Sequence, residues 1–155
     1  NSNLAYSPML ILIAAFAFTY SFNSQSLRFS GYHKKIRPIS TAINKHLTVP
    51  QSSVVISPLW FDKEIVYHSY PEMFNTYFGE VDSTSFFKKP LRKKDIQVIE
   101  YADEMELDRY KSILFIDDYS LSSIPDNGIL DRLDKNYTLR NQAEISGRKL
   151  YYYTK

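Results

Sequence analysis

Cysteine is absent from all 155 residues of the sequence. Its absence excludes disulfide bonds, thiolate nucleophiles, cysteine-ligated zinc and iron–sulfur clusters. The cellular compartment stays open, because cysteine-free proteins occur in reducing and in oxidising surroundings.

Glycine is scarce as well, with four residues at positions 31, 79, 128 and 147. These positions cannot supply the G-x-G-x-x-G loop of dinucleotide-binding proteins, a Walker loop or the G-x-S-x-G elbow of many hydrolases. The nucleotide-binding and hydrolase classes that depend on these motifs are therefore excluded.

Charge is missing from the front of the chain, where the first charged residue is Arg28. The 19 basic and 17 acidic residues give a net charge of +2. A field this weak does not favour a nucleic acid, and we expect no nucleic-acid partner.

The uncharged stretch from Leu4 to Phe22 reads LAYSPMLILIAAFAFTYSF. Its length matches the roughly 30 Å of hydrocarbon that a membrane-spanning helix crosses. Two alternatives remain, a signal peptide and a buried helix of a soluble core, but no basic n-region precedes the apolar run. We expect residues 1–27 to form a transmembrane or membrane-proximal helix with its linker, and residues 28–155 to form a soluble domain. Because the sequence does not begin with Met, we expect it to be a piece of a longer protein.

Basic residues follow this stretch at Arg28, Lys34, Lys35 and Arg37. The positive-inside rule would place the following domain in the cytoplasm, although domains of this size can translocate despite nearby charge. These side chains could contact anionic lipid headgroups or simply be solvated at the start of a helix.

The rest of the chain alternates between helical and strand-like patterns. Apolar residues at helical spacing predict a helix from Ile36 to Leu47, and Asp62 is a possible cap for a helix through KEIVYHS. The remaining expected elements are strands at 53–57, 95–101 and 112–117, helices at 72–78, 102–110 and 129–137, a loop at 80–94, and a hairpin about Ser146-Gly147. This order predicts an α/β fold: a small three-layer-like domain with a mostly parallel sheet and a C-terminal β-hairpin, preceded by the hydrophobic helix.

Open α/β sheets bind ligands outside the carboxyl ends of their strands. Trp60 and Asp62 follow one buried strand, and Asp117 and Asp118 follow another. An indole and carboxylates in one crevice could bind a sugar by stacking and hydrogen bonding. The alternative is structural, with the aspartates capping or turning the chain and the indole covering the core.

No other pattern predicts chemistry. The three histidines, His33, His46 and His68, lack zinc-ligand spacing, and we expect no metal, cofactor or catalytic residue in this chain. A basic cluster at 88–94 precedes an acidic one at 100–108. The basic cluster could bind phosphate or lipid headgroups, and the two clusters could pair with one another across the fold, but a solvated surface is the favoured interpretation.

The order of features resembles the C-terminal region of bacterial membrane glycosyltransferases of the GT-C type, which include the dolichyl-phosphate-mannose-protein mannosyltransferase-like and aminoarabinose-transferase-like proteins. The matching segments are LILIAAFAF, KKIRPISTAINKHL, VVISPLWFD, YHSYPEMFNTYFG, ILFIDD and RKLYYYTK. These segments cover nearly the whole chain. What they share with the family is the order of helices and strands, and they include none of its catalytic residues.

The resemblance implies the accessory, extracytoplasmic C-terminal domain of an enzyme that uses a lipid-phosphate-linked sugar. Its partners would be membrane lipid and, through the parent protein, the lipid-linked sugar and a glycan or protein acceptor. The acidic catalytic residues of this family lie in an early loop that the sequence does not contain, so no catalytic residue is carried over. The basic residues after the uncharged stretch conflict with this extracytoplasmic placement, because the positive-inside rule would place the domain in the cytoplasm. The alternatives are a membrane-anchored carbohydrate-binding or interaction module and a small soluble enzyme.

Overall fold

The computed structural model describes residues 35–73, 87–118 and 124–155, apart from the side chain of Trp60. Contacts divide the chain into two units, Asn1–Lys35 and Ile36–Lys155, and the fold described here is that of the second unit. The proposed membrane helix and the boundary at residue 27 lie outside the described residues. None of the helices in the described ranges has the length and apolar composition needed to cross a bilayer.

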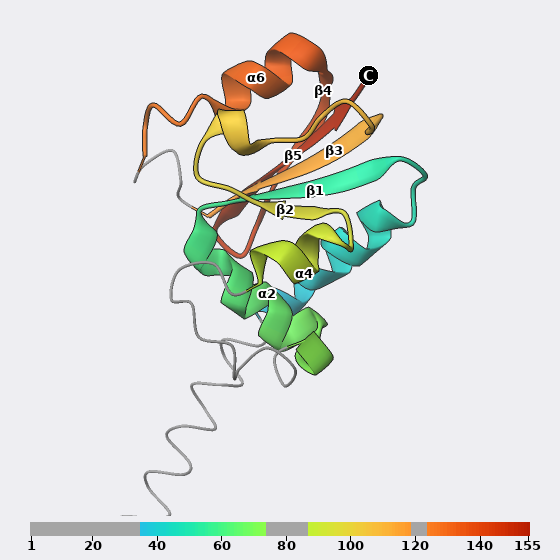
Figure 1. The fold of residues 1–155 in the computed structure, drawn as a ribbon, viewed down its shortest axis with the longest axis vertical. Coiled ribbons are helices and arrows are strands. Elements are labelled where there is room, and N and C mark those ends of the chain that lie inside the picture. The colour runs from blue at the N-terminus through green and yellow to red at the C-terminus, as the bar shows by residue number, and fades with distance from the viewer. Residues whose placement is uncertain (1–34, 74–86, 119–123) are drawn as a thin grey trace, which may run out of the picture. The chain divides into compact units, whose positions relative to one another are not determined.

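The second unit is an α/β domain built on a five-stranded mixed sheet in the order β2-β1-β3-β5-β4 (Figure 1). The strands are β1 (Ser52–Ser57), β2 (Ile96–Val98), β3 (Ser112–Asp117), β4 (Thr138–Ile145) and β5 (Arg148–Thr154). β1 pairs in parallel with β2 and β3, whereas β5 pairs antiparallel with β3 and β4. The sheet is therefore mixed: β2, β1 and β3 are parallel, as expected, and the C-terminal hairpin adds the antiparallel strands β5 and β4 at the β3 edge.

Helices lie on both faces of the sheet, which gives three layers (Figure 1). The first face is covered by a helix over residues 35–47, by α2 (Asp62–Ser69) and by α4 (Lys88–Arg92). The second face is covered by α6 (Ile129–Asn136) and by the connection over residues 99–111, which contains the short 3-10 helix η2 (Ala102–Glu104).

The strands separate two apolar cores, because successive side chains of a strand point to opposite faces. Ile56, Leu114 and Leu150 belong to the first core, whereas Phe115 and Tyr151 belong to the second. The apolar runs of β1 and β3 are buried on both faces, as expected for strands between two helical layers.

Two expected elements are wrong. Residues 88–92, expected to be loop, form the helix α4, because Leu91 and the preceding Phe87 are buried in the first core. Residues 102–110, expected to be helical, contain only the single turn of η2. There Met105, Leu107 and Tyr110 reach the second core from an irregular backbone.

The hairpin was predicted correctly, including its two-residue connection. Ser146 and Gly147 both have positive φ angles, 55° and 79°. Two such residues are typical of the type I′ turn, whose twist matches that of the flanking strands.

Candidate functional site

The carboxyl ends of β1 and β3 meet at one edge of the sheet, as the sequence predicts. Ser57 pairs in register with Asp117, and the backbone N–H of Asp118 donates to the carbonyl of Ser57 at 2.8 Å. After β1 the chain turns to α2 on the first face, and the helix that follows β3 is α6 on the second face. This divergence marks the position at which open α/β sheets bind ligands.

The two aspartates at this edge, Asp117 and Asp118, lie on opposite faces of the sheet. Asp118 is 2.9 Å from Nε of Arg148, and the same guanidinium lies 4.4 Å from the ring centre of Phe61 in the first core. Asp117 lies toward the second core, where burial raises the pKa of Tyr151 and the negative charge of Asp117 raises it further. They therefore do not form one carboxylate pair.

Arg148 also reaches α2, with its Nη2 3.3 Å from Oε2 of Glu64. Its side chain is 12% exposed and that of Asp118 is 8% exposed, so solvent screens this pair weakly. The arginine thereby ties the hairpin to α2 and to the end of β3, which gives Asp118 a structural role.

Asp62 is the first residue of α2 rather than its cap, because Phe61 occupies the cap position. Burial raises the pKa of its carboxyl group, while the backbone N–H groups of Lys63 and Phe87 act in the opposite direction. Asp62 thus joins the start of α2 to the start of α4. Trp60 lies nearby in the 3-10 helix η1 (Leu59–Phe61), and its side chain lies outside the described residues.

The hydroxyl of Ser57 is the unusual group at this edge. Ser57 is fully buried, and its Oγ has no hydrogen-bond partner among the described residues. Buried hydroxyls are normally paired, so the lack of a partner distinguishes Ser57 from most buried polar groups.

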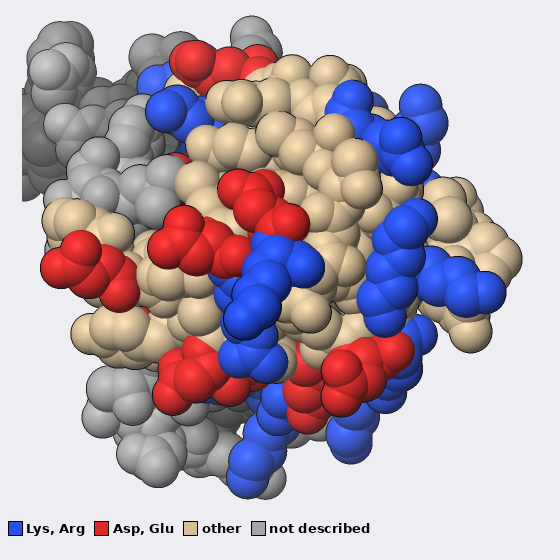
Figure 2. All heavy atoms as spheres, turned by 90° about the horizontal axis from the view of Figure 1, so that it is seen from above, with Lys and Arg blue, Asp and Glu red and all other residues tan. Residues whose placement is uncertain are grey.

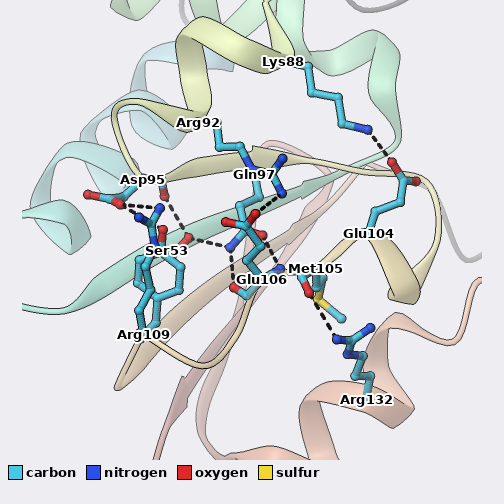
Figure 3. A network of polar contacts seen from close by, with 11 residues as sticks. Ser53, Lys88, Arg92, Asp95, Gln97, Glu104, Met105, Glu106, Arg109 and Arg132 are labelled. Atoms are coloured by element: carbon cyan, nitrogen blue, oxygen red, sulfur yellow. Dashed lines mark hydrogen bonds and ion pairs between the residues drawn. The ribbon is translucent and has the colours of Figure 1, made fainter.

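A second group of polar residues lies beside β2 and joins the two charge clusters (Figure 3). Lys88 forms an ion pair with Glu104, and Nη2 of Arg92 is 2.7 Å from Oε1 of Glu106. Burial acts to raise the pKa of Glu104, but hydrogen bonds from Lys88 and from the backbone N–H groups of residues 100 and 101 together lower it. The basic and acidic clusters therefore pair with one another across the fold, the structural alternative that the sequence left open.

The amide of Gln97 lies at the centre of this network (Figure 3). Its Nε2 donates to Oγ of Ser53 at 3.0 Å and to the carbonyl of Glu106 at 2.9 Å, and its Oε1 accepts from the N–H of Glu106 at 2.7 Å. Arg132 of α6 holds the same connection through the carbonyls of Ala102 and Met105. We interpret these contacts as structural, since they fix the 99–111 connection to β2 and α6.

A groove of about 500 Å³ opens on the first face, between the 35–47 helix and the hairpin. Its lining residues are Pro38, Thr41, Ala42, Lys45, His46, Val49, Asn141 and Tyr152. His46 is 9% exposed, and its Nε2 is buried without a hydrogen-bond partner. The sequence pattern predicts no function for His46. It lies seven residues after Ile39 and three after Ile43, so the helical period that identified the buried face also includes it.

Within the described ranges, no three histidine or acidic side chains are grouped so that they could hold a metal ion. Acidic and basic side chains also lie next to one another over the face seen in Figure 2.

Comparison with protein-family models, with curated proteins and with solved structures found no match to this chain.

Proposed function

We propose that this chain is the accessory C-terminal region of a GT-C type membrane glycosyltransferase, contributing binding surface and no catalytic group. The observation that carries the proposal is the order of the segments on which the resemblance rests. The 35–47 helix, β1 ending at Ser57-Pro58, β3 ending at Asp117-Asp118 and the hairpin ending in tyrosines follow one another in a single α/β unit.

The engagement of the acidic residues supports an accessory role. Asp118 is bound to Arg148 and Asp62 to backbone N–H groups, so both side chains have structural partners in the fold. A reacting carboxylate instead needs an open path to its substrate and a pKa suited to proton transfer. In this proposal the parent protein provides the reaction chemistry, and residues 28–155 lie outside the cytoplasmic membrane.

The test starts from the complete gene. Its reading frame should extend upstream through repeated hydrophobic spans, and membranes that contain its product should transfer sugar from a polyprenyl-phosphate donor. A start codon just before Asn1, or spans without any donor-dependent transfer, would contradict the proposal. A product truncated after the last span should show whether the domain is required, with expression of both forms measured in the same membranes.

A membrane-anchored carbohydrate-binding module is the second candidate. It is favoured by the unpartnered hydroxyl of Ser57, which lies at the carboxyl edge of the sheet in register with Asp117. Titrating methyl glycosides while recording Trp60 fluorescence tests this candidate, with Ser57→Ala as the variant that should weaken the response. An unchanged signal across neutral and lipid-linked sugars counts against it.

A further inference from the structure

We infer that two copies of this chain associate through the outer edge of β4, whose charges are self-complementary when two such strands pair antiparallel about Gln142. β4 is the last strand of the sheet, and among the described residues it pairs with β5 alone. Its outer edge therefore presents backbone N–H and C=O groups that a further strand can bind. This inference does not depend on the function proposed above.

The side chains along β4 are accessible to such a partner. Six of its eight residues are exposed and the other two, Ala143 and Ile145, are half-buried. A bulge between Leu139 and Asn141 leaves Arg140 without a cross-strand partner on β5. From Asn141 onward the pairing with β5 is regular, so this part of the strand has the extended edge that β-strand addition requires.

The charges of β4 select one register for the added strand. Antiparallel pairing about Gln142 places Arg140 of each copy opposite Glu144 of the other, so symmetry creates two ion pairs. Opposite charges directly across a strand pair are favourable, and like charges are unfavourable. Parallel pairing in register would place each of these charges opposite its own kind. Antiparallel pairing about Ala143 would place Gln142 opposite Glu144 and lose both ion pairs.

Both charged side chains are free to form these contacts. Neither Arg140 nor Glu144 forms an ion pair with another described residue. Nε of Arg140 donates to Oγ1 of Thr154 at 2.8 Å, which leaves the other N–H groups of the guanidinium for a carboxylate of the second copy. Glu144 lies opposite Lys149 of β5, so in the dimer it lies between two cations.

The pairing surface is one short strand from each copy, so the dimer should be weak. Stable complexes bury roughly 1,200–2,000 Å², and smaller interfaces belong to transient ones. We expect a dissociation constant on the order of 10–100 µM. Sedimentation equilibrium of the full chain in detergent micelles measures it.

Reversing the charges tests the register. Arg140→Glu places carboxylates opposite one another at both symmetric positions and should raise the dissociation constant about tenfold. Glu144→Arg should act similarly, whereas the double variant restores both ion pairs with the signs exchanged and should return to within about threefold of the unmodified chain. Lys135→Glu, at an exposed position on α6, makes the same change in net charge as Arg140→Glu and should leave association unchanged.

A disulfide locates the two-fold axis, because the sequence contains no cysteine. Gln142→Cys brings sulfur atoms of the two copies to directly opposite positions, where Cα atoms lie about 4.5–5.5 Å apart and a disulfide can form. Thr138→Cys, on the same exposed strand, lies about 27 Å from its counterpart in this register and should not cross-link. The inference is overturned by a chain that stays monomeric at about 500 µM, by association that charge reversal does not weaken, or by equal cross-linking of the two cysteine variants.

Discussion

At the scale of single residues, Arg148 connects several segments near the carboxyl edge of the sheet. It contacts Asp118, Glu64 and Phe61, which belong to three different segments. Removing one member of a buried ion pair leaves the other charge without compensation. Arg148→Met should therefore lower the free energy of unfolding by about 3 kcal/mol, as measured by urea denaturation.

The matched control for this change is Lys149→Met, at the exposed neighbouring position, for which we expect less than about 0.5 kcal/mol. The double variant Arg148→Met/Asp118→Asn should recover part of the loss, because the buried carboxylate is then gone. If Arg148→Met proves no more costly than Lys149→Met, the bridging role of Arg148 is wrong.

The buried carboxyl group of Asp62 should make stability depend on pH. Its pKa is raised by burial in the folded protein, so its contribution to stability is fully present below the pKa of the unfolded chain and is lost as the pH rises through the folded pKa. Asp62→Asn should consequently gain stability relative to the unmodified protein as the pH rises from about 3 to 7. Urea denaturation across this range measures the difference, and Asp131→Asn on the exposed side of α6 controls for the loss of one charge. A difference that is constant with pH would contradict the assignment.

At the scale of elements, the 99–111 connection depends on Gln97 because most of its backbone has no regular hydrogen-bonding pattern. The Gln97 amide bonds both the N–H and the carbonyl of Glu106, as a neighbouring strand would. Gln97→Leu leaves these groups unpaired and should cost about 2 kcal/mol. Hydrogen exchange at the amide of Glu106 should accelerate correspondingly, whereas Gln142→Leu in the exposed strand β4 should leave it unchanged. Unaltered exchange in Gln97→Leu would show that the other contacts suffice.

The sequence predicted elements whose pattern is local and failed where distant contacts decide. β1, β3, α6 and the hairpin carry clear apolar periods or turn residues, and all four were predicted correctly. In α4, a short basic segment becomes helical because Phe87 and Leu91 find apolar partners from distant parts of the chain. Helices this short are unstable without tertiary packing, so local pattern alone could not identify it.

The candidate sites show the same contrast between features that follow from local pattern and features that depend on distant contacts. The strand pattern correctly brought the carboxyl ends of β1 and β3 to one edge of the sheet. It could not reveal that Asp118 binds Arg148, because the two residues come together only when β5 pairs with β3. The groove around His46 was missed for a similar reason, since its two walls are the 35–47 helix and the C-terminal hairpin.

At the scale of the whole molecule, one sheet supplies side chains to both apolar cores, so the two faces should unfold together. Phe115 of the central strand β3 stacks on Tyr151 in the second core, with ring centres 5.6 Å apart. Its neighbours Leu114 and Ile116 face the first core. A change confined to one face must therefore destabilise the strand that supports the other.

Phe115→Ala should cost about 3–5 kcal/mol, and Leu139→Ala, at a position 42% exposed on β4, should cost less than about 0.5 kcal/mol. Native-state hydrogen exchange measures how the loss is distributed. Amides of α2 on the first face and of α6 on the second should accelerate by the same factor in Phe115→Ala, because their exchange requires the same global opening. Acceleration confined to α6 would mean that the two layers open independently and that the shared sheet does not couple them.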